Sequence, residues 1–375
     1  MKLKKKTMYW LIPVLIVALM GVGVGAYFGF AFIPYKGTKT TDVWDRTAEF
    51  NATKDYAKTM DMGEKDEFVI LNLADIQIED LKPAMHKPTF EMLDKLIKST
   101  EPDLITLTGD QVSGPYVRIT LKKICKFIDG YGIPWAPVLG NHDGEWNCTR
   151  NGNGDIYLNS GYKNVVFQKN DPALGVGNYI INITKNDKSV HTVFMIDSHN
   201  ERKYDHGTDY DYIWPEQLDW YEWAVKGIAK QNGDRIVPSS CFFHIAIPEY
   251  VDAYKAYEEG KAQGGNVNRE GICCADHKAA KPYNSGFYAK MKELGSTKLT
   301  VVGHDHANCS WVDYDGIVLA YGLKSGYGSY YDKDLVGGTT VTVKKDGSTK
   351  LDYYRYIDGE IKLDNNITGK ERTGK

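Results

Sequence analysis

Short apolar runs and stretches with helical spacing alternate along most of this chain. Residues 68–74, 104–108 and 134–139 are almost all apolar. Runs of that length are typical of buried strands. Between them, apolar residues spaced for one face of a helix predict helices at 88–99 and 120–131. This alternation of strand and helix predicts an α/β protein.

The second half of the chain repeats the same pattern. A helix is predicted at 214–229, where apolar residues recur at helical spacing. Further strands are predicted at 193–198, 241–248, 300–306, 317–321 and 339–343. The chain has 375 residues, of which 42% are hydrophobic, and this is enough for one large domain or two small ones.

Polar side chains with useful chemistry stand at or near the ends of five of these strands. Open α/β sheets bind ligands at the carboxyl ends of their strands, so we expect these side chains to lie close together. A single Asp after a strand, or a single His inside an apolar run, is more often structural, and the repeated placement is the stronger observation. In chain order the five blocks are Asp75-x-Gln77, Gly109-Asp110, Gly140-Asn141-His142-Asp143, His244 and Gly303-His304-x-His306.

The block at residues 140–143 combines three different chemistries after one glycine. The amide of Asn141 can ligate a hard metal ion, and the imidazole of His142 can transfer a proton near neutral pH. The carboxylate of Asp143 can orient that imidazole. An ordinary polar turn is the alternative, because Gly, Asn and Asp are common turn residues. His304 and His306 form a plausible metal-binding pair if their turn is tight.

The first forty residues differ from the rest. Four lysines precede residues 8–33, which carry no charge. As a helix these 26 residues would be about 39 Å long, enough to cross a hydrocarbon core of about 30 Å. We expect a retained signal anchor at 1–36, with a cleaved signal peptide and a secreted protein as the alternative. The basic N-terminus predicts a single-pass protein of the cell membrane with its folded part outside.

The charge distribution disfavours duplex nucleic acid as the main partner. Residues 1–36 contain five lysines and no acidic residue, so the overall net charge of −3 becomes −8 for the rest of the chain. A nucleic-acid-binding domain usually carries a basic stripe instead. A small anionic substrate would need a local positive site, which metal ions could supply.

Six cysteines leave the redox state open. An external location permits disulfides, and a bridge between Cys148 and Cys309 is one option. Cys125 and Cys241 lie in apolar runs and are expected to be buried thiols. A zinc site formed by Cys273, Cys274 and His277 is a weaker alternative, because adjacent cysteines rarely ligate one ion together.

The order of the five blocks closely resembles the calcineurin-like metallophosphoesterase superfamily, over residues 68–356. The chain resembles more narrowly the small purple-acid-phosphatase-like branch. The supporting stretches are Phe242 to Tyr250, Asn284 to Tyr288, Gly303 to Asn308 and Gly326-Tyr327-Gly328. The resemblance implies a four-layered α/β/β/α sandwich at 67–358, here preceded by the N-terminal transmembrane helix, a linker at 37–66 and followed by a polar tail at 359–375.

The resemblance also implies a centre of two divalent metal ions, Mn, Zn or Fe. Carried over to this sequence, His142 would contact the phosphoryl oxygens or protonate the leaving oxygen, with Asp143 as its orienter. Asp110 would bridge both ions. The first ion would be held by Asp75, Asp110, His306 and position Gln77, and the second by Asp110, Asn141, His244 and His304.

Two positions depart from the family pattern. The superfamily commonly has His where this chain has Gln77, and a side-chain amide is a weaker ligand than imidazole. We therefore expect weaker metal binding at the first site. Purple acid phosphatases carry a Tyr where this chain has Ser113, so neither a tyrosinate ligand nor its charge-transfer colour is expected.

These observations predict a membrane-anchored, externally facing, metal-dependent phosphoesterase that acts on phosphate esters. The alternative is a catalytically weakened, metal-binding surface protein that keeps the fold, and Gln77 is its only support in the sequence. The sequence leaves the oligomeric state and the choice between monoesters and diesters open. His199 and His206 lie in a polar loop and are expected to be exposed, and a role in substrate binding is the alternative.

Overall fold

The computed structural model describes residues 19–22, 25, 33–40, 43–169, 171–205, 207–266, 283–367 and 372–373. The membrane span predicted within 1–36 lies mostly outside these residues. Within them, none of the helices combines the length and the apolar character that crossing a bilayer requires.

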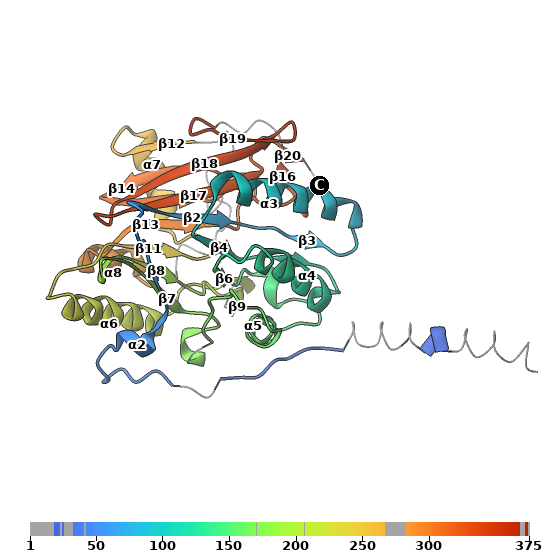
Figure 1. Ribbon diagram of the computed structural model, residues 1–375, viewed down its shortest axis with the longest axis horizontal. Coiled ribbons are helices and arrows are strands. Elements are labelled where there is room, and N and C mark those ends of the chain that lie inside the picture. The colour runs from blue at the N-terminus through green and yellow to red at the C-terminus, as the bar shows by residue number, and fades with distance from the viewer. Residues whose placement is uncertain are drawn as a thin grey trace, which may run out of the picture.

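One large sheet carries the first three polar blocks. Its strands lie in the order β19-β18-β17-β2-β4-β6 (Figure 1). β2, β4 and β6 are parallel, and β17, β18 and β19 continue the sheet in antiparallel pairs. The bounds are β2 Glu67–Leu73, β4 Leu104–Thr108, β6 Trp135–Val138, β17 Gly337–Lys344, β18 Thr349–Ile357 and β19 Glu360–Leu363.

A second large sheet carries the two histidine blocks. Its strands lie in the order β1-β7-β8-β11-β13-β15-β14-β12. The central strands β8, β11, β13 and β15 are parallel. The bounds are β1 Tyr56–Asp61, β7 Tyr179–Lys185, β8 Lys188–Met195, β11 Ser239–Phe242, β12 Gln263–Gly265, β13 Thr297–Val302, β14 Trp311–Tyr314 and β15 Ile317–Tyr321.

The main hydrophobic core contains side chains from both sheets. Alternate residues of β8 point to opposite faces, as the period of a strand requires. Val193 and Met195 join the core shared with β2 and β4, whereas Phe194 packs in a separate cluster with Trp220 and Tyr221. The strand is therefore buried on both faces, which explains its continuous apolar run.

Helices cover the outer parts of the two sheets. α3 (His86–Thr100) and α4 (Val117–Asp129) pack into the main core, and α6 (Pro215–Gln231) and α8 (Phe287–Leu294) into the second cluster. α3 buries Met92, Leu93 and Leu96 at helical spacing. Other α-helices of the described residues are α2 Ala52–Asp55, α5 Arg150–Asn159 and α7 Glu249–Glu258, and other short strands are β3 Ile78–Glu79, β5 Val112–Ser113, β9 Glu201–Tyr204, β10 Gly207–Tyr210, β16 Tyr331–Asp332 and β20 Arg372–Thr373.

The α/β class and the predicted strands and helices are confirmed, with boundaries that differ by a few residues. The structure adds elements where we expected only irregular chain. The segment 37–66 contributes β1, which pairs in parallel with β7 at the edge of the second sheet. The segment 359–375 begins with β19, which pairs with β18. A strand at a sheet edge needs no apolar run of its own, so its composition did not reveal it.

Four cysteines lie within the described residues, and all are buried free thiols. The bridge considered between Cys148 and Cys309 is therefore wrong. Cys148 Sγ lies 3.1 Å from Asn153 Oδ1, and Cys309 Sγ lies 3.0 Å from the Asn266 carbonyl. Cys125 and Cys241 are buried thiols as predicted. The alternative zinc site at residues 273–277 lies outside the described residues.

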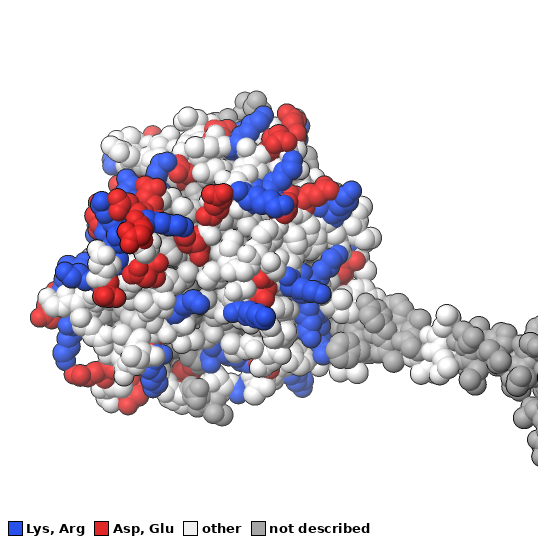
Figure 2. Space-filling view, in the orientation of Figure 1, with Lys and Arg blue, Asp and Glu red and all other residues white. Residues whose placement is uncertain are grey.

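Acidic and basic side chains are interspersed on the face of the molecule shown in Figure 2. Several form surface ion pairs, such as Lys98 with Asp94 and Lys345 with Asp66. Pairs of this kind contribute little to stability, because water screens both charges. A different set of polar side chains, which includes Asp75, Asp110 and His244, is buried.

Candidate metal centre

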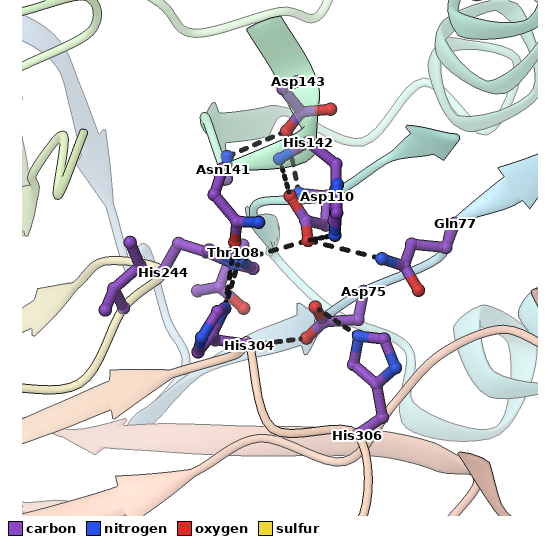
Figure 3. A network of polar contacts seen from close by, with 12 residues as sticks. Asp75, Gln77, Thr108, Asp110, Asn141, His142, Asp143, His244, His304 and His306 are labelled. Atoms are coloured by element: carbon purple, nitrogen blue, oxygen red, sulfur yellow. Dashed lines mark hydrogen bonds and ion pairs between the residues drawn. The ribbon is translucent and has the colours of Figure 1, made fainter. Parts of the chain in front are cut away.

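All five polar blocks converge at the carboxyl ends of strands from the two sheets (Figure 3). Asp75 follows β2 and Asp110 follows β4, whereas His244 and His304 follow β11 and β13 of the other sheet. Asn141 follows β6. Because parallel strands end at one edge, the fold brings together residues as distant in the sequence as Asp75 and His304, which are 229 positions apart.

Three buried side chains form a group that could hold a metal ion. One ligand atom from each of Asp75, Asp110 and His244 lies within 4.8 Å of the other two. All three side chains are almost inaccessible to solvent. Two carboxylates buried so close together repel each other, and a cation between them removes that penalty.

The ring of His244 is oriented toward this group. Its Nδ1 lies 2.8 Å from the Thr108 carbonyl, which can only accept a hydrogen bond. Nδ1 therefore carries the proton, and Nε2 of the neutral ring is an acceptor. That Nε2 lies 3.0 Å from Asn141 Oδ1 and 3.3 Å from Asp110 Oδ2, which are also acceptors. Three acceptor atoms that converge in this way need a cation, either a metal ion or a second proton on the ring.

His304 completes this half of the centre. Its Nδ1 lies 2.9 Å from Asn141 Oδ1 and 3.3 Å from His244 Nε2. One amide oxygen thus faces two imidazole nitrogens. Figure 3 shows the Asn141 side chain reaching between its own loop and the two rings. Neutral imidazole and amide oxygen are both suitable ligands for divalent transition metals.

His306 and Asp75 form the other half. His306 Nδ1 lies 2.8 Å from the Tyr330 carbonyl, so this nitrogen donates and Nε2 is the acceptor. Nε2 lies 3.3 Å from Asp75 Oδ1, yet this buried oxygen has no hydrogen-bond partner. Two acceptor atoms at this separation, without hydrogen-bond geometry, suit two ligands that face a common ion. The fixed tautomer of His306 is typical of metal-binding histidines.

The charges of the centre are strongly coupled. Burial opposes ionisation of Asp110, but the His244 and His142 rings outweigh it and hold the pKa of the carboxyl below its usual range. Burial would lower the pKa of His244, yet the Asp110 carboxylate raises that pKa to about 9. Negative charge therefore persists at Asp110, and it attracts any available cation.

The backbone of the centre is unusual. Asp75, Gln77, Asp110 and His304 all have positive φ angles, of 51°, 39°, 54° and 73°. Such conformations are uncommon outside glycine and cluster at functional sites. Gly140 is required for a different reason, since a Cβ there would overlap Asp110 Oδ1. The Asp110 carboxylate therefore lies directly against the turn that follows β6, at Gly140.

His142 lies at the rim of the centre, with its side chain 38% exposed. Its Nε2 is 4.0 Å from Asp110 Oδ2, and its Nδ1 is 2.8 Å from Glu145 Oε1. Burial would lower the pKa of His142, but Glu145 and Asp110 raise it to about 9. Sequence reasoning missed Glu145, although its spacing of three residues from His142 in a turn was a usable signal.

The predicted role of Asp143 as the orienter of His142 is wrong. Asp143 Oδ2 accepts hydrogen bonds from the backbone N–H groups of Asp110 (2.7 Å) and Gly140 (2.9 Å), and Oδ1 accepts one from Gln111 (3.0 Å). The carboxylate thus ties two strand-end turns together and points away from the imidazole (Figure 3). The short 3-10 turn at His142–Gly144 directs consecutive side chains to different sides.

Gln77 lies beside Asp110, but its amide is engaged on both sides. Its Nε2 lies 3.3 Å from Asp110 Oδ2, and its Oε1 accepts a hydrogen bond of 3.0 Å from Lys324 Nζ. Sequence reasoning missed Lys324, which is completely buried. Burial lowers the pKa of Lys324 to about 8, against the opposing effect of Asp75.

The glycine-rich stretch at residues 326–328 passes over the Ile76–Gln77 backbone so closely that a Cβ at Gly326 or Gly328 would overlap a carbonyl oxygen.

The expectation that His199 is exposed is also wrong. Its ring is buried, stacks on Trp214 at 3.8 Å between ring centroids, and has Nε2 2.8 Å from Gln217 Oε1. It belongs to a buried polar network with Asp197, which also pairs with Arg150. His206 lies outside the described residues.

The residues present suit two divalent cations. One half of the centre offers the Asp75 carboxylate and His306 Nε2, the other offers Asn141 Oδ1 with two imidazoles, and Asp110 lies between them. The orphaned Asp75 Oδ1 and the acceptors around His244 both call for positive charge. Mixed nitrogen and oxygen donors of this kind suit Mn, Zn or Fe.

Comparison with known proteins gives the same family. The family model described as calcineurin-like phosphoesterase matches residues 68–308. The chain is 30% identical over 299 residues to a protein of Arabidopsis thaliana named probable inactive purple acid phosphatase 29, covering 70% of this chain and 73% of that one. It is 29% identical over 276 residues to phosphatase DCR2 of Saccharomyces cerevisiae, covering 67% of this chain and 44% of the other.

Solved structures align with this chain at low sequence identity. The purple acid phosphatase PPD1 of yellow lupin (Lupinus luteus) aligns with a TM-score of 0.47 and 12% identity, over 82% of this chain and 54% of that chain. A dimetal phosphatase of Danio rerio aligns with a TM-score of 0.49 and 12% identity, over 76% and 98%. From the family model and the sequence relatives, this chain belongs to the calcineurin-like phosphoesterases, in their purple-acid-phosphatase-like branch.

Proposed function

We propose that this protein is a metal-dependent phosphoric ester hydrolase with a centre for two divalent ions. The observation that carries the proposal is the convergence of acceptor atoms at His244 Nε2, Asn141 Oδ1 and Asp110 Oδ2. The Thr108 carbonyl holds the His244 tautomer that makes this cluster of acceptors. Family membership supports hydrolysis of phosphate esters as the reaction.

In this proposal six side chains divide into two ligand sets that share Asp110. Asp75, Asp110 and His306 hold one ion, and Asp110, Asn141, His244 and His304 hold the other. When bound, two such ions neutralise the phosphate oxygens and supply a hydroxide nucleophile by lowering the pKa of bound water. Both carboxylates stay ionised, because the pKa values of Asp75 and Asp110 lie below their usual range.

His142 is the proposed acid for the leaving oxygen. Its ring stands at the exposed rim, where a leaving group would depart, and Nε2 faces the centre. Glu145 holds Nδ1 and favours the protonated ring. A protonated imidazole at this position can stabilise the phosphoryl oxygens or give its Nε2 proton to the alkoxide.

The location of the protein is part of the proposal. A signal anchor at 1–36 would hold residues 37–375 at the outer face of the cell membrane, and cleavage would give a secreted enzyme instead. Two contacts place parts of the described ranges 33–40 and 43–50 against the folded domain. Tyr35 N donates to the Asn147 carbonyl at 2.7 Å, and Trp223 Nε1 donates to the Ala48 carbonyl at 2.7 Å. In an anchored protein, the chain that joins the membrane segment to the domain would therefore contact the domain at Tyr35 and at Ala48.

A catalytically weakened metal-binding protein is the second candidate. Two observations favour it: the Arabidopsis relative is named probable inactive, and the Gln77 amide is engaged by Lys324 and Asp110. The two candidates share metal binding and differ in turnover.

A metal-dependence assay tests the proposal. Purified full-length protein is expected to hydrolyse an aryl phosphate monoester or a bis-aryl diester with Mn²⁺, and to lose activity with a chelator. Asn141→Ala and His304→Ala are expected to abolish turnover, whereas Asn159→Ala, at the exposed end of α5, keeps it. Binding of Mn²⁺ without turnover on any ester would favour the weakened protein, and full turnover in both ligand variants would overturn the site assignment.

A further inference from the structure

Lys324 is a buried lysine directly beside the candidate metal centre. It lies in the segment between β15 and β17, where its backbone bridges to Ala74 and to Val336. Its Nζ donates to the Asp75 carbonyl at 2.8 Å and to Gln77 Oε1 at 3.0 Å. Among the ion pairs of the described residues, none involves Lys324. Three carboxylates act on its positive charge: those of Asp75 and Asp110 in the centre, and that of Glu79.

The two neighbours of Gln77 determine which way its amide points. An ammonium group has donors and no acceptor, so the Gln77 atom that faces Lys324 must be the oxygen. The other end is then the NH2 group, which suits the Asp110 carboxylate it faces. A flipped amide would put NH2 against the ammonium and oxygen against the carboxylate, and both contacts would be repulsive.

We infer that Gln77 is not a metal ligand and that Lys324, by holding its amide oxygen, makes the two metal positions unequal. The inference rests on the proposed two-metal function and specifies it further. The position at Asp75 and His306 then has three protein ligands and a fixed positive charge beside it. The position at Asn141, His244 and His304 has four protein ligands, counting Asp110.

Both features lower the affinity for a metal ion at the first position, the one at Asp75 and His306. Loss of one ligand removes a bond to the ion, and the Lys324 ammonium repels a divalent cation in a low-dielectric interior. Interactions next to the ligands commonly change metal affinity by about 10–100-fold. The first ion is therefore expected to exchange freely while the second stays bound. Harder ions such as Mn²⁺ or Mg²⁺ suit the first position, because two of its three ligands are carboxylates.

Calorimetric titration of the metal-free full-length protein with Mn²⁺ measures this directly. The wild type is expected to show one tight and one weak ion, with dissociation constants about 100-fold apart. Lys324→Met removes the charge at similar length, and Gln77→His supplies a ligand. In the double variant Gln77→His/Lys324→Met the two constants should come within about tenfold of each other. Lys298→Met, on an exposed position of β13, is the matched control and should leave the wild-type pattern unchanged.

The outcomes separate the inference from the proposed function. Two equally tight ions in the wild type, with hydrolysis intact, would overturn the inference alone, and this result needs no variant to fold. An unchanged gap in a double variant that keeps the wild-type circular dichroism would also overturn it. Failure of the folded wild type to bind any Mn²⁺ would instead overturn the metal-dependent function itself.

Discussion

Glu145 Oε1 lies 2.8 Å from Nδ1 of His142, at the rim of the candidate metal centre. The imidazole is thus held between a carboxylate on its outer side and Asp110 on its inner side, with Nε2 toward the centre. A carboxylate at Nδ1 both orients the ring and favours its protonated form. This pair is where the proposed chemistry is most directly testable.

Glu145→Gln is expected to lower kcat for alkyl phosphates by roughly tenfold, with little change in KM. The amide keeps a contact to Nδ1 but removes the charge that favours the protonated ring. Aryl phosphates should be less affected, because their leaving groups need little help from an acid. Steady-state kinetics on both substrate types checks this, with Glu293→Gln, at an exposed position of α8, as the control. An equal loss on both substrates would argue against proton donation by His142.

Asp143→Ala is expected to destabilise the protein by about 3 kcal/mol or more, because three buried backbone N–H groups lose their acceptor. Asp143→Asn should cost less, since the amide oxygen can still accept. Urea unfolding of the metal-free protein measures both effects apart from catalysis. If Asp143→Ala unfolded at the wild-type urea concentration while only activity fell, the tying role assigned to this carboxylate would be wrong.

Gly328→Ala is expected to disturb the centre without touching a proposed ligand. A methyl group there would overlap the Gln77 carbonyl oxygen, so the segment that carries Lys324 must move. We expect a lower melting temperature and altered Mn²⁺ binding. Gly130→Ala is the control, because that residue has a helical φ of −64° and its nearest new contact would be 3.3 Å away. Wild-type stability and Mn²⁺ binding in Gly328→Ala would contradict the close approach.

His191 is expected to make the protein less stable in acid. Its ring is fully buried, with Nδ1 3.0 Å from the Gly347 carbonyl and Nε2 2.9 Å from Ser240 Oγ. Burial lowers the pKa of His191 to about 4, against about 6.5 in an unfolded chain. The unfolded state therefore binds the proton more tightly. The contribution of neutral His191 to the free energy of unfolding is fully present above pH 6.5. It falls by about 3 kcal/mol as the pH drops from 6.5 toward 4.

Urea unfolding of metal-free wild type and His191→Gln between pH 7.5 and pH 4 tests this contribution. The variant should lose about 3 kcal/mol less than the wild type over that range. His86→Gln controls for the removal of a histidine from a less buried site. Parallel curves for the wild type and His191→Gln would show that His191 contributes nothing to the acid sensitivity.

Local features of the sequence were enough for the elements and for most of the candidate site residues. Apolar runs such as 68–74 and 104–108 became β2 and β4, because a strand buried on both faces needs a continuous apolar stretch. Asp75 and Asp110 could be singled out since polar residues directly after such strands must lie at one edge of a sheet. The edge strand β1 escaped notice, because an exposed strand carries a mixed composition.

Only the tertiary structure decided which groups these residues contact. Asp143 follows His142 directly, yet its carboxylate bonds to the backbone of another strand-end turn, and Glu145 takes the contact with the imidazole. Lys324 reaches Gln77 across 247 positions of sequence, and no local pattern encodes such a meeting. The order of polar blocks follows from strand periodicity, which is local. Hydrogen-bond partners in the turns depend on backbone angles and on segments brought from elsewhere in the chain. Which residue contacts which partner at this centre is therefore decided only in the folded molecule.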